Sequence, residues 1–201
     1  MVEHRIDMFR YSWELENLKK KPILKDATLF YGSSTFAIWK DLEEVFKEYH
    51  AMNFGFGGST SDEALFHYES LAKPVKPKVL VFYNGDNEPV CSYTVEETIE
   101  LYQAVFNRFR EDFPGIKIIV LETKTSPARD EYKDFVNALN KWSREYVSLN
   151  DDMYFVETKD LCKDAQGNYK LDSYLDDQLH FSPKSYVIIA ERIKEILKKI
   201  Y

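Results

Sequence analysis

The chain has 201 residues, of which 44% are hydrophobic and 30% are charged, and its formal net charge is −7. This composition is that of a soluble globular protein with enough residues for a sizeable core, so we expect a single domain over 1–201. An acidic chain without a block of basic residues is a poor candidate for nucleic-acid binding, because phosphates require clustered Lys and Arg.

Apolar runs and helical periods predict alternating elements along the chain. Residues 1–25 are predicted to be an N-terminal extension packed on the body, with a short helix around Trp13, Leu15 and Leu18. The predicted strands are 27–31, 51–54, 79–83, 116–121 and 153–156. The predicted helices are 36–49, 61–71, 95–112, 129–147 and 183–199. Five strands that alternate with helices predict an α/β fold with a parallel sheet.

Polar residues follow four of these strands, and the carboxyl ends of parallel strands meet at one edge of the sheet. The four loops contain Gly32-Ser33-Ser34, Gly57-Gly58, Asn84-Gly85-Asp86-Asn87 and Asp176-Asp177-Gln178-Leu179-His180. Together they bring a hydroxyl, bare backbone amides, a carboxamide, a carboxylate and an imidazole to one place. Acyl transfer at a serine requires this set of groups, because the serine needs a base and the oxyanion needs N–H donors.

The last of these loops predicts a carboxylate–imidazole pair. Asp177 and His180 are three residues apart, which on one helical turn places both on one face and in contact. Asp176 is the alternative partner, but it is four residues from His180. A carboxylate on one ring nitrogen fixes the histidine tautomer, so that the other nitrogen can act as base.

At this point the sequence resembles the SGNH hydrolases, the GDSL-like lipase and acylhydrolase family, in four blocks. The resembling blocks are Tyr31-Gly32-Ser33-Ser34-Thr35, Asn53 to Ser59, Gly85-Asp86-Asn87, and Asp177-Gln178-Leu179-His180. The resemblance implies a flavodoxin-like three-layer α/β/α sandwich with a five-stranded parallel sheet.

The same resemblance implies a role for each matching residue. Ser34 would be the nucleophile, with His180 as base and Asp177 as its orienting acid. The backbone N–H groups of Ser34 and Gly58 and the Asn87 amide would form the oxyanion hole. Two positions depart from the family pattern: Ser33 stands where an aspartate is common, and Glu88 follows Asn87 where an aspartate is frequent.

The resulting hypothesis is a serine esterase that cleaves short-chain esters, acetyl esters especially, without a metal or organic cofactor. We expect Phe56, Glu88 and Ser126 to line the substrate pocket. The partner is a small-molecule ester, with no nucleic acid and no membrane insertion, and a homo-oligomer is left open. The first residues contain no apolar run, so we expect no signal peptide and a cytoplasmic protein.

Two alternatives remain at this stage. A flavodoxin-type protein also carries a hydroxyl- and glycine-rich loop after its first strand, where it binds phosphate or flavin. That interpretation gives no role to Asn87, Asp177 or His180. The other alternative is an SGNH fold retained only for binding.

Overall fold

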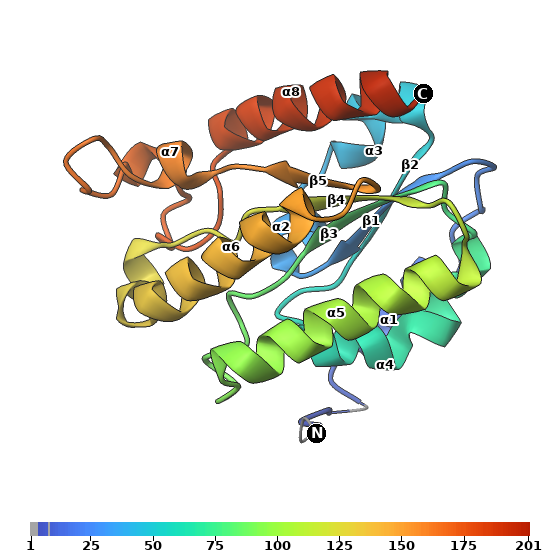
Figure 1. Ribbon diagram of the computed structural model, residues 1–201, viewed down its shortest axis with the longest axis horizontal. Helices are drawn as coiled ribbons and strands as arrows, with labels where there is room; N and C mark the ends of the chain where they lie inside the picture. Colours follow the sequence, from blue (N-terminus) through green and yellow to red (C-terminus); the bar gives the residue numbers. More distant parts are fainter. Residues whose placement is uncertain (1–3, 8) are drawn as a thin grey trace.

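The computed structural model describes residues 4–7 and 9–201 and contains a five-stranded parallel sheet covered by helices on both faces (Figure 1). The strand order is β2-β1-β3-β4-β5, with β1 at Thr28–Gly32 and β3 at Val79–Tyr83 beside it. The remaining strands are β2 (Ala51–Gly55), β4 (Lys117–Leu121) and β5 (Met153–Val156). The predicted α/β sandwich with a five-stranded parallel sheet is confirmed.

Helices form a layer on each face of the sheet (Figure 1). One layer holds α1 (Ser12–Lys19), α4 (Ser61–Leu71), α5 (Val95–Asp112) and α6 (Lys133–Ser148). The other holds α2 (Ser34–Ala37), α3 (Leu42–Val45), α7 (Lys159–Cys162) and α8 (Pro183–Ile200). Short 3-10 helices lie at Lys47–Tyr49, Lys73–Val75, Pro127–Tyr132 and Leu171–Ser173.

The central strands are buried on both faces, which explains their uninterrupted apolar sequences. All five residues of β1 and of β3 are buried. Alternate side chains enter opposite cores: Leu29 and Tyr31 face the layer of α4 and α5, whereas Phe30 faces the layer of α8. The loops after β1 and β3 are therefore held by the most rigid part of the sheet.

The close approach of β1 and β3 explains the glycine that ends β1. Gly32 has a φ of +138°, and a Cβ at this position would lie 1.9 Å from the carbonyl oxygen of Tyr83. The next residue, Ser33, donates its N–H to that same carbonyl oxygen at 3.1 Å. Only glycine fits here, and the chain then turns directly into the loop that carries Ser34.

The single helix expected over 36–49 is wrong. The chain instead forms α2, α3 and the 3-10 turn at Lys47–Tyr49. The breaks allow Trp39 and Phe46 to pack against each other and against Phe30, at ring-centroid distances between 4.9 and 6.5 Å. Packing of these rings on the sheet has overridden the helical period.

The N-terminal segment packs on the α4 side of the molecule. In α1, Leu15 and Leu18 are buried, whereas Trp13 is 80% exposed. Tyr11 contacts the Phe56 ring at 5.2 Å and donates a hydrogen bond to Glu63 at 2.9 Å. This segment therefore lies against the loop between β2 and α4.

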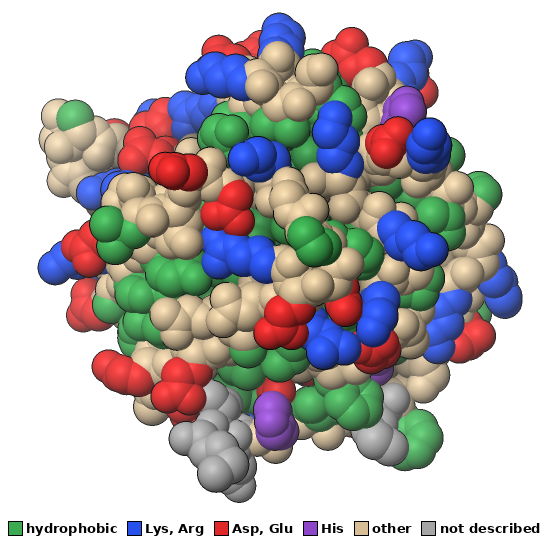
Figure 2. Space-filling model, turned by 45° about the vertical axis from the view of Figure 1, so that its right-hand side comes forward, with side chains coloured by type: hydrophobic (Ala, Val, Ile, Leu, Met, Phe, Trp, Pro, Cys, Tyr) green, Lys and Arg blue, Asp and Glu red, His purple; other side chains and the backbone are tan. Residues whose placement is uncertain are grey.

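The surface carries mixed charge. On the face seen in Figure 2, acidic and basic side chains are interspersed among apolar and polar ones. Among the described helices, none combines the length and the apolar character that crossing a bilayer requires.

Candidate active site

Three side chains from distant parts of the chain form a hydrogen-bonded line at the carboxyl edge of the sheet. Ser34, the first residue of α2, follows β1 directly. The Nε2 atom of His180 lies 3.0 Å from Ser34 Oγ, and its Nδ1 atom lies 2.6 Å from Oδ2 of Asp177. With the ring proton on Nδ1, the imidazole donates to the carboxylate and accepts from the serine hydroxyl. The structure thus brings together the three side chains that the sequence analysis grouped.

Asp177 and His180 lie in a tight turn, so the expected helical turn at this point is wrong. Gln178 between them has a φ of 55°, which is left-handed and interrupts any helix. The Oδ1 atom of Asp177 accepts the backbone N–H groups of Leu179 at 2.9 Å and His180 at 3.0 Å. An aspartate often folds a turn in this way, and here it leaves Oδ2 free for the imidazole.

The same hydrogen bonds determine the ionisation of Asp177. Burial opposes the charged form, but the bonds from the His180 ring and from the two backbone N–H groups lower the pKa of Asp177 to about 2. Asp177 is therefore a carboxylate across the neutral range and can orient the imidazole there. Its side chain remains 47% exposed, so water also solvates this charge.

Ser33 organises the N–H donors beside Ser34. Its buried Oγ accepts the backbone N–H of Ser34 at 2.6 Å and Nδ2 of Asn87 at 2.9 Å. Asn87 Nδ2 also donates to the carbonyl oxygen of Ser59 at 2.9 Å, and Asn87 Oδ1 accepts from Arg129 at 2.9 Å. These partners satisfy only one orientation of the amide. Ser33 thus supplies the kind of acceptor that an aspartate would supply at this position.

The glycine loop after β2 lies next to the Asn87 amide. Gly58 has a φ of +78°, and a Cβ there would come within 2.8 Å of an Arg10 nitrogen. The N–H of the preceding Gly57 donates to Glu14 at 3.2 Å. Within the described part of the chain, the N–H of Gly58 has no hydrogen-bond partner. Of the three expected oxyanion donors, Gly58 is therefore the one with no intramolecular bond.

A buried ion pair behind the nucleophile was missed in the sequence. Lys124, in the loop after β4, has a fully buried side chain that pairs with Asp86. Its Nζ also donates to the Tyr83 hydroxyl at 2.9 Å and to Thr35 Oγ1 at 3.3 Å. Burial opposes ionisation of Asp86, but the charges of Lys124 and Arg129 lower its pKa below the usual value. The signal was a lysine placed soon after a buried strand, at the edge where the other loops meet.

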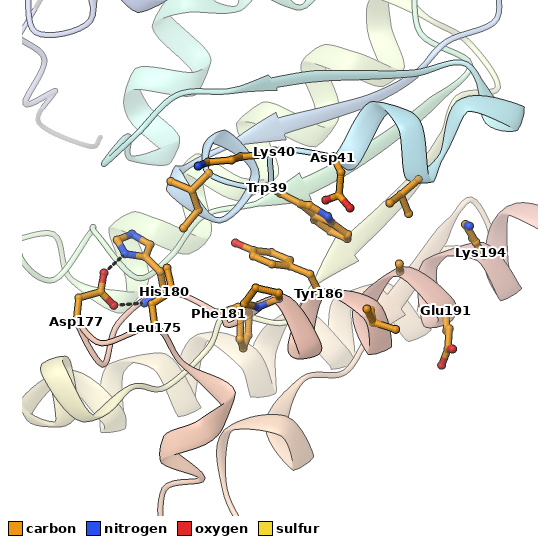
Figure 3. A pocket seen from close by; sticks show the side chains of 15 residues that line it. Trp39, Lys40, Asp41, Leu175, Asp177, His180, Phe181, Tyr186, Glu191 and Lys194 are labelled. Atoms are coloured by element: carbon orange, nitrogen blue, oxygen red, sulfur yellow. Dashed lines mark hydrogen bonds and ion pairs between the residues drawn. The ribbon is translucent and has the colours of Figure 1, made fainter.

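A groove with a volume of about 780 Å³ begins at His180 and Asp177 and follows α8 (Figure 3). The segment from Ile38 to Asp41 forms one wall, and α8 forms the other. Between them, the rings of Trp39 and Tyr186 stack with centroids 4.5 Å apart. His180 and Asp177 line one end of the groove, and Lys194 lines the other (Figure 3).

Comparison with known proteins identifies the family. The model of the GDSL-like Lipase/Acylhydrolase family matches residues 28–188, which include Ser34, Gly58, Asn87 and His180. The chain belongs to this family. It is accordingly a hydrolase of ester bonds, and the flavodoxin-type alternative is set aside.

Named relatives and solved structures of this family agree. The platelet-activating factor acetylhydrolase IB subunit alpha2 of Rattus norvegicus is 34% identical over 187 residues, covering 86% of this chain and 76% of that protein. A GDSL-like lipase from Bacteroides thetaiotaomicron superposes with a TM-score of 0.75 at 22% identity, covering 96% of this chain and 97% of that one. The lipase/acylhydrolase from Enterococcus faecalis gives a TM-score of 0.73 at 16% identity, over 86% and 95% of the two chains. At these identities the two structures show a shared fold.

The three residues expected to line the substrate pocket lie inside the protein. Phe56 and Glu88 are 0% exposed and Ser126 is 2% exposed, and none of them lines the groove. The Phe56 ring packs against Tyr11 and Tyr31. The direction of a loop side chain depends on tertiary packing, which the sequence pattern does not reveal.

Glu88 has a structural place instead. Its carboxylate accepts the backbone N–H and the hydroxyl of Ser61 at 2.8 and 2.6 Å, and the N–H of Gly85 at 2.8 Å. Burial raises the pKa of Glu88 to about 7, although the hydrogen bonds from Ser61 oppose this rise. Glu88 thus ties the loop after β3 to the start of α4.

This raised pKa makes stability depend on pH. Between the ordinary value of 4.5 and about 7, the folded state holds a proton that the unfolded state has released. The free energy of unfolding should therefore fall as pH rises through this window, by roughly 3 kcal/mol at 1.36 kcal/mol per pKa unit. Glu88→Gln cannot ionise and should lose this part of the slope.

Urea unfolding at pH 5 and pH 7.5 measures the effect, with exposed Glu100→Gln as the matched control. The expected result is that only Glu88→Gln flattens the pH dependence. Equal slopes for wild type and Glu88→Gln would contradict the raised pKa. Glu88→Gln should also be less stable than wild type by the same amount at both pH values, because a Gln amide cannot accept all three hydrogen bonds. This constant loss does not affect the comparison of slopes.

Proposed function

We propose that this protein is a serine esterase that transfers a short acyl group, acetyl for example, to water through an acyl-enzyme on Ser34. The observation that carries the proposal is the line from Ser34 through His180 to Asp177, with contacts of 3.0 and 2.6 Å. These contacts lie within the range at which a base removes a proton from a nucleophile and an acid orients that base. The name of the rat relative, an acetylhydrolase, supports the acetyl group.

In the proposed first step, Ser34 Oγ attacks the ester carbonyl carbon while His180 Nε2 takes the hydroxyl proton. The new O–C bond gives a tetrahedral intermediate, whose collapse breaks the bond to the alcohol oxygen. His180 returns its proton to that oxygen, and the alcohol leaves. A water molecule then repeats the sequence on the acyl-enzyme and releases the acid. Asp177 stays ionised and stabilises the imidazolium in both halves.

The oxyanion of each intermediate would be bound at the edge shared by Ser34, Gly58 and Asn87. The Gly58 N–H has no partner among the described residues, the Ser34 N–H donates to Ser33 Oγ, and the Asn87 amide donates to Ser33 Oγ and to the Ser59 carbonyl oxygen. Arg129 supports this arrangement, since its hydrogen bond to Asn87 Oδ1 turns the NH₂ group toward Ser33. The Gly58 N–H is available to the oxyanion as it stands, whereas the N–H of Ser34 and the Asn87 amide would turn from their present acceptors toward the developing charge.

Labelling with a fluorophosphonate tests the proposal, because an activated serine attacks its phosphorus, displaces fluoride and becomes phosphonylated. We expect one adduct per chain, and peptide mapping should find it on Ser34. Hydrolysis of p-nitrophenyl acetate, butyrate and octanoate by the same preparation tests the short acyl group, with kcat/KM highest for acetate. Heat-denatured protein is the control for non-specific labelling. An adduct on another serine, or no adduct in an active preparation, would refute Ser34 as the nucleophile.

A further inference from the structure

The groove along α8 lies on one particular side of the proposed reaction centre. Its lining includes His180 and Asp177 but not Ser34, Gly58 or Asn87. His180 is the group that hands a proton to the leaving alcohol, so the alcohol portion of the ester must lie against His180. In the proposed function, the carbonyl oxygen of the acyl portion binds at Gly58 and Asn87, which lie outside the groove lining. A groove that begins at His180 therefore extends from the leaving-group side.

The walls of the groove are suited to an apolar ligand. Trp39 and Tyr186 stack on each other and form the apolar floor, with 3% and 7% of their surface exposed (Figure 3). Ile38 and Val187 add aliphatic side chains to the lining. Val187 is 59% exposed on α8, which is more than an aliphatic side chain in a closed core would be. A volume of about 780 Å³ lies within the range of roughly 300–1,000 Å³ for pockets that hold small organic ligands.

The charges at the groove disfavour an anionic ligand. Two basic residues, Lys40 and Lys194, and three acidic residues, Asp41, Asp177 and Glu191, belong to the lining. With Asp177 ionised, the acidic side chains outnumber the basic ones by one, so the groove offers no net attraction to an anionic group. The apolar rings and aliphatic side chains remain as the source of binding free energy.

We propose that this groove binds the alcohol portion of the substrate, and that the substrates are short-acyl esters of apolar alcohols with several carbon atoms and no anionic group. This assignment rests on the proposed serine-esterase function and adds the leaving-group specificity. During acylation the bond between the acyl carbon and the alcohol oxygen breaks. The alcohol accepts the proton from His180 Nε2 while its apolar chain lies in the groove along α8, against Ile38 and Val187.

Two matched series of esters separate the two sides of the site. The first keeps the acetyl group and lengthens the alcohol: ethyl, butyl, hexyl and octyl acetate. The second keeps ethanol and lengthens the acid: ethyl acetate, butyrate, hexanoate and octanoate. With acid release followed in a pH-stat, kcat/KM should rise about twofold to fourfold per methylene in the alcohol series. It should stay level or fall in the acyl series.

A pair of neighbouring variants on α8 tests whether the groove causes this preference. Val187 lines the groove, whereas the adjacent Ile188, which is 37% exposed, does not. Val187→Lys places a charge among the apolar walls and should lower the ratio of kcat/KM for octyl over ethyl acetate at least tenfold. Ile188→Lys adds the same charge to the same helix and should leave this ratio within about twofold.

The possible outcomes distinguish the two proposals. Hydrolysis that rises with acyl length and is indifferent to the alcohol would overturn the groove assignment and leave the serine esterase intact. Failure of every ester, together with no fluorophosphonate adduct on Ser34, would overturn the function itself. Light scattering of wild type and Val187→Lys measures the molar mass of each in solution and tests a third outcome. A dimer that Val187→Lys dissociates would make the groove an interface between two copies and would overturn its assignment to an alcohol.

Discussion

Replacement of Ser34 by alanine is expected to lower kcat for p-nitrophenyl acetate by about 10⁴- to 10⁶-fold, as removal of the nucleophile does in other serine hydrolases. This corresponds to about 5–8 kcal/mol of transition-state stabilisation. The variant retains the His180–Asp177 pair and the oxyanion donors, so KM should change much less than kcat. Initial rates of p-nitrophenol release at pH 8, measured over a range of substrate concentrations, give both constants.

The fold of the Ser34→Ala variant should be unaffected, because only the Oγ contact with His180 is lost. The backbone N–H of residue 34 still donates to Ser33 Oγ. Ser148→Ala, on the exposed end of α6, is the control for a lost serine hydroxyl and should keep full activity. A Ser34→Ala enzyme with more than about a tenth of wild-type activity would refute the acyl-enzyme mechanism.

Asp177→Asn should lower kcat by about 10²- to 10³-fold without loss of the fold. The Asn Oδ1 atom can still accept the N–H groups of Leu179 and His180, so the turn is preserved. Its NH₂ group, however, faces His180 Nδ1 and favours the tautomer that carries the proton on Nε2, which cannot accept from Ser34. A fully buried acid in another serine hydrolase contributes about 10⁴-fold. We expect less here because the Asp177 side chain is 47% exposed and water replaces part of its effect.

The neighbouring carboxylate provides a matched control for this variant. Asp176 is also exposed but forms no contact with His180, so Asp176→Asn should stay within about twofold of wild type. Rates are compared from pH 5 to pH 9, where Asp177 is ionised because its pKa is about 2. If Asp176→Asn lowered kcat more than Asp177→Asn, the assignment of Asp177 as the residue that orients His180 would be wrong.

The sequence was most informative where a residue pattern is typical of a single kind of structure. An uninterrupted apolar run located β3, as is typical of a strand covered on both faces. The other strands were located from shorter apolar runs, and β2 and β4 each contain a polar residue, Asn53 and Lys117. Thr60 and Thr94, each with a glutamate three residues later, form the capping boxes that begin α4 and α5. By contrast, the apolar period of 36–49 could not show that Trp39 and Phe46 would break the helix to pack on Phe30.

In the candidate site, too, the sequence could reveal some residues and not others. Ser34, Asp177 and His180 could be selected because their chemistry is distinctive and each follows a predicted strand. The walls of the groove could not, since Ile38 and Val187 are ordinary aliphatic residues that become neighbours only when α8 packs beside the segment after α2. The buried pair of Lys124 and Asp86 was hidden for a related reason, because charged residues in loops are usually solvated.

The turn that carries Asp177 and His180 has a consequence for how the site assembles and fails. The two residues are three positions apart, so their contact closes a very short loop, whereas Ser34 and His180 are 146 positions apart. The entropic cost of closing a loop grows with its length. The second contact depends on the packing of α8 against the segment that carries Ser34, where the Tyr186 hydroxyl donates to the Thr35 carbonyl oxygen at 2.8 Å. Mild heat or denaturant should therefore separate the nucleophile from a dyad that is still paired. Loss of activity would then report the loosening of α8 before the dyad itself is disrupted.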